Sequence, residues 1–130
     1  MPLEVDIIMH KECLEVIVSG DYDIQEAIDE FSSVLSACKI TGLSKVLIDF
    51  RKLHGEIYSI QKIIYSLQIV GQVKDYFASK GKDLQFAYVG KTPQVNKYKP
   101  GLEIAEREGI QAITSIDINE AFEWLGVKKT

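Results

Sequence analysis

The stretch Lys45-Val46-Leu47-Ile48-Asp49-Phe50 decides the fold class of this chain of 130 residues. Its apolar run is short and nearly continuous, which is typical of a strand that is buried on both faces of a parallel sheet. Helical patterns stand on both sides of it, over about residues 23–42 and 59–80. Parallel strands that alternate with helices define the α/β class, with right-handed crossovers between the strands. We therefore expect an α/β fold.

Two β-rich segments precede the first helix, at residues 3–9 and 13–19. The three residues between them fit a hairpin loop, so we expect the two strands to pair antiparallel. The first helix begins at a capping box of Asp23 and Glu26 and ends at Gly42. The N-terminal part of the chain thus predicts an antiparallel hairpin followed by an amphipathic helix.

The second half of the chain continues the alternation of strands and helices. Residues 84–89 predict a strand, residues 100–109 a short helix that starts at Pro100, and residues 110–115 a last strand. Asp117 and Glu120 form a second capping box before a final helix that ends at Gly126. The order ββαβαβαβα predicts a mixed, mostly parallel sheet of five strands with the helices packed on it. Residues 1–130 form a single domain in this prediction, because no linker or repeat interrupts them.

Composition and charge exclude several classes of function. The net charge of −4 and the pI near 5.2 lack the basic excess with which proteins bind nucleic acid. We expect no transmembrane segment and a cytoplasmic protein, because there is no apolar run of roughly 20 residues and no signal sequence. Cys13 and Cys38 have no neighbours at metal-ligand or redox spacing. We predict no metal site, no cofactor and no catalytic residues.

The order of elements resembles that of the STAS-like proteins. The resemblance is carried by Val46-Leu47-Ile48-Asp49-Phe50 before the long helix, by Gly109-Ile110, and by Glu120-Ala121-Phe122-Glu123-Trp124-Leu125 at the end. Over nearly the whole chain it is closest to the branch described as SpoIIAA-like or STAS/SEC14-like. The resemblance implies a non-enzymatic module that regulates by binding another protein. It also implies a small or lipid-like ligand as an alternative, since some relatives are suspected of holding one.

One segment departs from the pattern of that family. In the anti-anti-sigma members an Asp-Ser-Ser-Gly segment opens the helix after the third strand, and one of its serines is phosphorylated. The matching stretch here is Ile57-Tyr58-Ser59-Ile60, in which only Ser59 keeps a hydroxyl group. Serine is one of the preferred N-cap residues at the start of a helix. We therefore favour capping as the role of Ser59, and its phosphorylation stays an open alternative.

The long helix carries apolar residues on two sides. At about 100° per residue, one side is lined by Ile60, Ile63, Ile64, Leu67, Val70 and Phe77, and we expect this side to face the sheet. The other side carries Tyr65, Ile69, Val73 and Tyr76. Exposed apolar side chains in a row are rare in monomers, so we predict that these four residues bind a protein partner or a second copy in a homodimer. The alternative is that the loop at residues 91–100 or another segment covers them.

Charged and aromatic residues gather in the loops after the third and fourth strands. Ligands of α/β sheets bind at the carboxyl ends of parallel strands, so these loops suggest a carrier of a small anionic or apolar ligand as the alternative function. The candidate ligand-binding residues are Arg51, His54, Glu56, Tyr58, Ser59, Lys91, Lys97 and Tyr98. Solvated loop charges are the simpler interpretation of the same residues.

Overall fold

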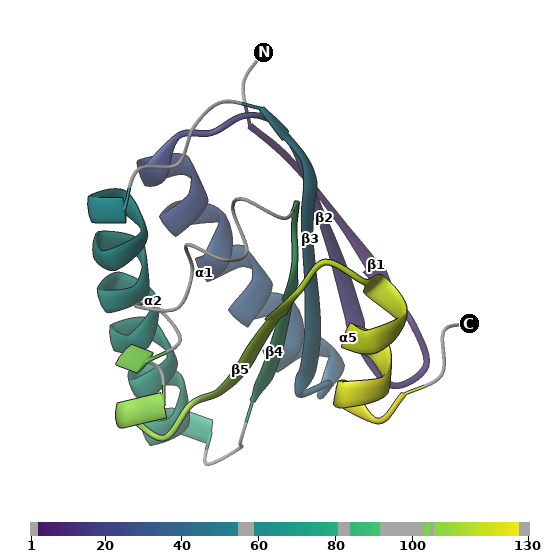
Figure 1. Cartoon of the computed structure of the whole chain (residues 1–130). Coiled ribbons are helices and arrows are strands. Elements are labelled where there is room, and N and C mark those ends of the chain that lie inside the picture. Colours follow the sequence, from purple (N-terminus) through teal and green to yellow (C-terminus); the bar gives the residue numbers. More distant parts are fainter. Residues whose placement is uncertain (1–2, 55–58, 81–83, 92–102, 105, 128–130) are drawn as a thin grey trace.

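A computed structural model describes residues 3–54, 59–80, 84–91, 103–104 and 106–127, with the backbone alone described at residues 59–63 and 77–80. Its elements along the chain are β1 (Glu4–Met9), β2 (Leu14–Asp21), α1 (Ile24–Thr41), β3 (Lys45–His54), α2 (Ser59–Lys80), β4 (Gln85–Val89), β5 (Gln111–Ser115) and α5 (Ile118–Leu125) (Figure 1). Residues 103, 104, 106 and 107, between β4 and β5, are also helical. The predicted order of these eight elements is confirmed, while the predicted start of the short helix at Pro100 lies outside the described residues.

The five strands lie side by side in the order in which the chain makes them, β1-β2-β3-β4-β5. The β1 strand pairs antiparallel with β2, and every later pair in the sheet is parallel. The mixed, mostly parallel sheet of the prediction is therefore confirmed. Because the order is sequential, β1 and β5 are the two edge strands.

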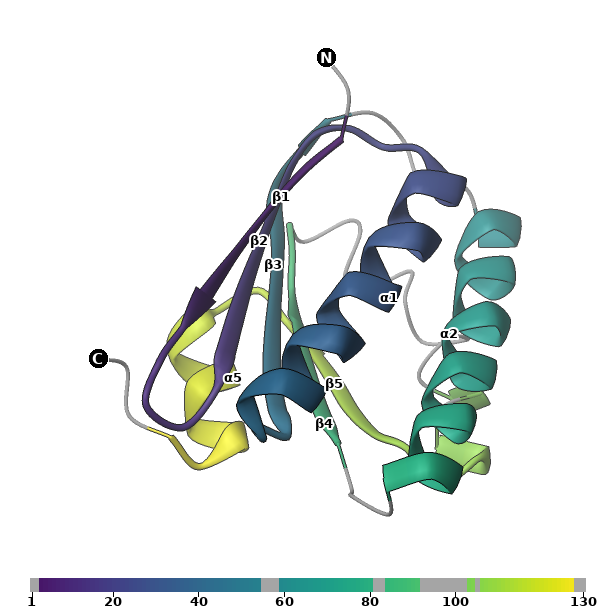
Figure 2. The same cartoon turned by 180° about the vertical axis from the view of Figure 1, so that it is seen from behind.

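The sheet is covered by helices on both faces. Helices α1 and α2 lie together on one face, and α5 lies on the other, over β3, β4 and β5 (Figures 1 and 2). Successive residues of a strand point to opposite faces. Ile48 therefore belongs to the large core under α1 and α2, while Leu47 belongs to a smaller core under α5. These two cores explain the continuous apolar run of residues 45–50.

The ends of α1 and α5 are set by local residues. Asp23 accepts a hydrogen bond from the backbone N–H of Glu26 (2.9 Å), and Gly42 closes α1 with a left-handed φ of 75°. Asp117 accepts from the N–H of Asn119 (2.8 Å), and Gly126 closes α5 with a φ of 72°. Glycine adopts this conformation at no steric cost, so it commonly follows the last turn of a helix. The predicted start and end of each of these two helices are confirmed.

The third strand is longer than its sequence suggests. The sequence predicts a loop directly after Phe50, but β3 continues to His54, and residues 55–58 lie outside the described residues. The reason is the length of β2, whose last residues Ser19, Gly20 and Asp21 pair with residues 52–54 of β3. Polar residues are tolerated in this part of the strand because it extends past β4 and past the cover of α5.

Candidate functional site

Helix α2 turns a different side towards the core from the one that its sequence pattern suggested. Ile69, Val73 and Tyr76 are buried, with 8%, 0% and 9% of their surface exposed, and Tyr65 is half-buried. The prediction that these four residues form an exposed surface for a partner or a homodimer is therefore wrong. The alternative, in which other parts of the chain cover them, is the correct one.

The error has a physical cause, which is that α2 has two neighbours within the chain. It packs on the sheet and also on α1, where Gln72 accepts a hydrogen bond from the hydroxyl of Ser32 (2.8 Å) and donates one to the carbonyl of Ile28 (3.4 Å). A helix that packs against two neighbours needs a wider apolar arc than an ordinary surface helix. The spacing of apolar residues alone therefore does not identify the open side. The exposed Lys74 and Asp75 are the sequence signal that marks it.

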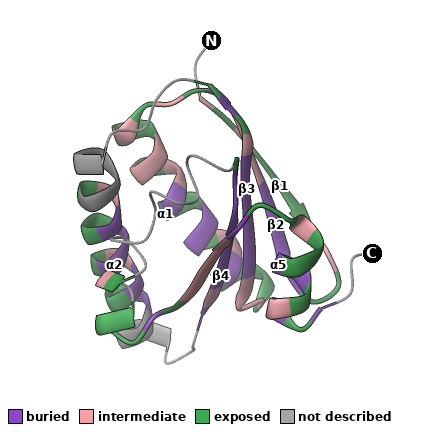
Figure 3. Cartoon of the chain, in the orientation of Figure 1, coloured by how far each residue is buried: buried purple, intermediate pink, exposed green. Residues whose placement is uncertain are grey.

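The open side of α2 carries three residues that we call the α2 strip: Ile64, Leu67 and Gly71. Their spacing of three and four residues places them on one face of the helix. Ile64 and Leu67 are 43% and 57% exposed, although the sequence pattern assigned both to the core. Figure 3 shows the outer side of α2 exposed and the side towards α1 and the sheet buried. The α2 strip is thus an apolar surface on the outside of the molecule.

Gly71 is unusual within this strip because the fold does not require a glycine there. A Cβ atom built at Gly71 would meet no atom of the described residues within 4 Å. Its φ is not in the left-handed region either. A glycine inside a helix costs about 1 kcal/mol relative to alanine. The intramolecular contacts of the described residues offer no compensation for this cost.

An apolar pocket lies on the α1 and α2 side of the sheet, towards the carboxyl ends of β2 and β3. Its free volume is about 60 Å³, which holds a few non-hydrogen atoms. The lining is apolar except for the carboxylate of Glu30 and the hydroxyls of Tyr22, Tyr65 and Tyr88. The pocket therefore offers an apolar wall with a few hydrogen-bonding groups, but its volume lies below the roughly 300–1,000 Å³ of sites for drug-sized molecules, so it suits a ligand of a few non-hydrogen atoms.

Burial in the pocket keeps Tyr22 and Tyr65 uncharged at physiological pH. Burial raises the pKa of Tyr22 to about 12, and the charge of Asp23 contributes to this rise. Burial also raises the pKa of Tyr65 well above its ordinary value, and Tyr88 adds to the effect. The hydroxyls of Tyr65 and Tyr88 lie 3.3 Å apart and share a hydrogen bond. This pair can exchange its mutual hydrogen bond for one to a bound polar group.

Gly90, directly after β4, fixes one wall of the pocket. A Cβ atom at this position would lie 2.5 Å from Cε2 of Phe50, whose ring lines the pocket. The backbone N–H of Gly90 donates to the carbonyl of Ser115 (3.0 Å), so this segment is held in place. Any side chain at Gly90 would push the Phe50 ring aside.

A buried carboxylate and its cationic partner occupy the other face of the sheet. The guanidinium of Arg51 donates from Nε to Oδ1 of Asp49 (2.9 Å) and from Nη2 to Oδ2 (2.8 Å). Burial raises the pKa of Asp49, but the hydrogen bonds and charge of Arg51 outweigh it, so the pKa lies below its ordinary value. A carboxylate engaged in this way is poorly suited to act as a general base. We assign Asp49 the structural role of holding Arg51.

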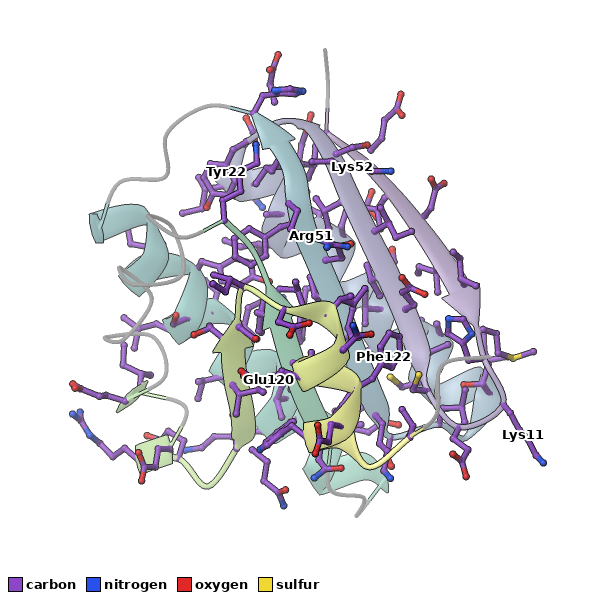
Figure 4. All side chains as sticks on the ribbon, turned by 45° about the vertical axis from the view of Figure 1, so that its right-hand side comes forward. Lys11, Tyr22, Arg51, Lys52, Glu120 and Phe122 are labelled. Atoms are coloured by element: carbon purple, nitrogen blue, oxygen red, sulfur yellow. The ribbon has the colours of Figure 1, made fainter. Side chains whose placement is uncertain are left out.

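An extra residue in β3 shapes the surface around this pair. Ile17 pairs with Asp49 but Ser19 pairs with Lys52, so β3 has one residue more than β2 in this interval, which is a β-bulge. The bulge brings the consecutive residues Arg51 and Lys52 to the same face of the sheet. Figure 4 shows both side chains on one side of β3.

The structure does not unite the predicted ligand residues of the two loops. Arg51 pairs with Asp49, while the exposed His54 and Lys91 follow at the ends of β3 and β4. Among the described residues, no contact joins Arg51, His54 and Lys91 to one another. The other predicted positions lie outside the described residues: Glu56, Tyr58, the side chain of Ser59, Lys97 and Tyr98. A ligand site in these loops therefore stays a prediction, whereas the apolar pocket was missed because its residues come from β1 through β4.

Two searches of the described part of the chain were negative. No helix there is long and apolar enough to cross a membrane. The same residues hold no group of three or more His, Cys, Asp or Glu side chains placed to bind a metal ion.

Comparison with solved structures identifies the fold. An anti-sigma factor antagonist from Mycobacterium paratuberculosis matches with a TM-score of 0.59 at 16% identity, over 96% of this chain and 95% of that chain. The anti-sigma factor antagonist SpoIIAA in its unphosphorylated form matches with a TM-score of 0.53 at 12% identity, over 97% of this chain and 100% of that chain. An uncharacterised protein of the DUF3478 family from Shewanella loihica, described as having a SpoIIAA-like fold, matches with a TM-score of 0.53 at 16% identity, over 95% and 93% of the two chains.

These matches confirm the STAS-like fold that the sequence resemblance implied. More narrowly, the fold is that of the SpoIIAA-like proteins. No protein-family model matches the chain. A search of the curated proteins found no match either.

Proposed function

We propose that this chain is a non-enzymatic regulatory module that binds another protein through the α2 strip. The observation that carries the proposal is the exposure of Ile64 and Leu67 beside Gly71, on the open face of a helix whose other sides are packed. Apolar side chains gain about 25 cal/mol for each Å² that a partner removes from water. A glycine in the strip lets the backbone of a partner approach closely.

The fold neighbours support a binding role. Two of them are named as anti-sigma factor antagonists, which are proteins defined by their action on another protein. We place the activity in the cytoplasm, where the two free thiols Cys13 and Cys38 stay reduced. The module acts on its partner by occupying a surface, so it needs neither a catalytic group nor a cofactor.

The proposal is tested by capture of the partner from the cells that express the chain. Tagged wild type, Leu67→Glu and Ile40→Glu are compared, since Ile40 on α1 is an equally apolar side chain that is 83% exposed and lies outside the strip. A buried interface leucine is worth more than about 1 kcal/mol, so Leu67→Glu should reduce recovery of the partner about tenfold. Ile40→Glu should recover it fully. Equal recovery with all three proteins would exclude the α2 strip as the binding surface.

The apolar pocket favours a second candidate function, the binding of a small apolar ligand that carries one hydrogen-bonding group. The pocket is lined by Tyr65 and Tyr88, whose hydroxyl groups can bind that group, and its other walls suit an apolar body. Native mass spectrometry of freshly purified protein should then show a retained small mass. Ala27→Leu, which adds bulk to the pocket lining, should lose that mass, while Ile40→Leu should keep it. A retained mass that Ala27→Leu does not affect would place the ligand elsewhere.

A further inference from the structure

The outer edge of β1 carries apolar side chains together with backbone groups that no other strand of the described sheet pairs with. Ile7, Ile8 and Met9 are consecutive in β1 and are 38%, 42% and 67% exposed. β1 is an edge strand of the sheet, and Figure 2 shows it at the margin of the molecule. Natural proteins usually protect such an edge with lysine, proline or a bulge. The first half of β1 carries the charged residues Glu4 and Asp6, but residues 7–9 contain neither a charged residue nor proline, and the register of β1 with β2 is regular.

The hydrogen-bond pattern of the hairpin shows which backbone groups point outwards. The N–H of His10 donates to the carbonyl of Cys13 (2.9 Å), and the two residues are opposite each other in the hairpin register. In an antiparallel pair, hydrogen-bonded and non-hydrogen-bonded residue pairs alternate. The even-numbered residues of β1 therefore bond to β2, and Val5, Ile7 and Met9 point their N–H and C=O groups away from it. Leu3 agrees with this alternation, because its N–H donates to Oε2 of Glu26 on α1 and not to β2.

We propose that two copies of this chain pair through β1, antiparallel and with Ile7 opposite Ile7 on the two-fold axis, to form one continuous sheet. A two-fold axis perpendicular to the sheet keeps each side chain on its own face, so a residue can stand opposite itself in this register. Val5 of each copy then stands opposite Met9 of the other. The outward backbone groups of Val5, Ile7 and Met9 all find partners in this arrangement.

The charges of β1 allow a second copy to occupy the edge in this register. In the proposed register Asp6 stands opposite Ile8, and Glu4 stands opposite His10, so no carboxylate faces another carboxylate. Like charges directly opposite each other are destabilising in a sheet. Pairing one residue along, with Asp6 on the axis, would bring the two Asp6 carboxylates together and is excluded on that ground. On the face towards α1, Val5, Ile7 and Met9 form a continuous apolar ladder with their counterparts.

Disulfide trapping tests the register directly. The Cα atoms of a hydrogen-bonded antiparallel pair lie about 5.5 Å apart, within the range of about 4.4–6.8 Å that a disulfide spans. Ile7→Cys should therefore form a covalent dimer under mild oxidation. Ile8→Cys is the matched control, since Ile8 is adjacent and similarly exposed but stands opposite Asp6, and it should not become cross-linked. The native Cys13 and Cys38 are fully buried and should not contribute.

The unmodified protein should also sediment as a concentration-dependent dimer in analytical ultracentrifugation. Ile7→Pro removes an outward N–H and no bond to β2, so it should give a folded monomer, with folding checked by circular dichroism. Ile40→Lys, a change on α1, should leave the dimer intact. The proposal would be overturned by a wild type that stays monomeric at every concentration. It would equally be overturned if the Ile8→Cys variant cross-linked while the Ile7→Cys variant did not.

Discussion

Replacing Gly71 by alanine should make the protein more stable and a weaker binder. The added Cβ atom has no atom of the described residues within 4 Å, so the change brings no clash and no packing with them. The gain is the difference in helix propensity, about 1 kcal/mol in the free energy of unfolding. For a chain of this length, about 1 kcal/mol corresponds to a rise of about 4 °C in the melting temperature. Urea unfolding followed by far-ultraviolet circular dichroism measures the change.

The same substitution at Gly126 is a control of opposite sign. Gly126 has a φ of 72°, and an added Cβ would approach Nζ of Lys45 only to 3.7 Å, so the cost is confined to the backbone. Alanine in the left-handed region costs about 1–2 kcal/mol. Gly126→Ala should therefore lower stability, and Gly71→Ala should raise it while reducing capture of the partner. A loss of stability in Gly71→Ala would refute the reasoning, because it would mean that the fold itself needs this glycine.

Three further predictions concern the pocket and the buried charges. Gly90→Ala should lower the free energy of unfolding by about 1–3 kcal/mol in urea titrations, because its Cβ displaces the Phe50 ring, and an unchanged midpoint would contradict this. The pKa of Tyr22 is about 12 in the folded chain and 10.0 ordinarily, so its contribution to the free energy of unfolding should be complete below pH 10.0 and be lost as the pH rises towards about 12. The Tyr22→Phe variant should lose less stability than the wild type over this interval. Equal slopes of stability against pH for the two proteins would count against the burial of the hydroxyl. The pKa of Asp49 is lowered from 3.8, so its contribution to the free energy of unfolding is present above pH 3.8 and is lost as the pH falls below it. Unfolding measured at decreasing pH should therefore show a shallower loss of stability for Asp49→Asn than for the wild type.

The sequence predicted the parts of the fold that rest on local rules. The capping residues Asp23 and Asp117 and the glycines at the helix ends determine where α1 and α5 begin and end, so both were found from short patterns. The buried run in β3 was found because a strand covered on both faces is apolar without alternation. These features can be predicted without knowing which helices and strands contact one another in the fold.

The α2 strip and the apolar pocket depend on contacts between elements that are distant in the sequence, so they could not be predicted from the sequence alone. Which side of α2 is open depends on α1, whose contact through Ser32 and Gln72 joins residues 40 positions apart. The pocket was missed for the same reason, because its lining comes from β1, β2, α1, β3, α2 and β4. The continuation of β3 past Phe50 depends on pairing with the end of β2. Polar residues such as Lys52 give no sequence signal for this pairing.

Hydrogen exchange of the backbone amides, with and without the captured partner, tests the central claim most directly. If the α2 strip is the binding surface, the partner should slow exchange in α2 around residues 64–71 and leave the exposed face of α1 around Ile40 unchanged. Protection confined to other elements, with α2 exchanging at the rate of the free protein, would contradict the account.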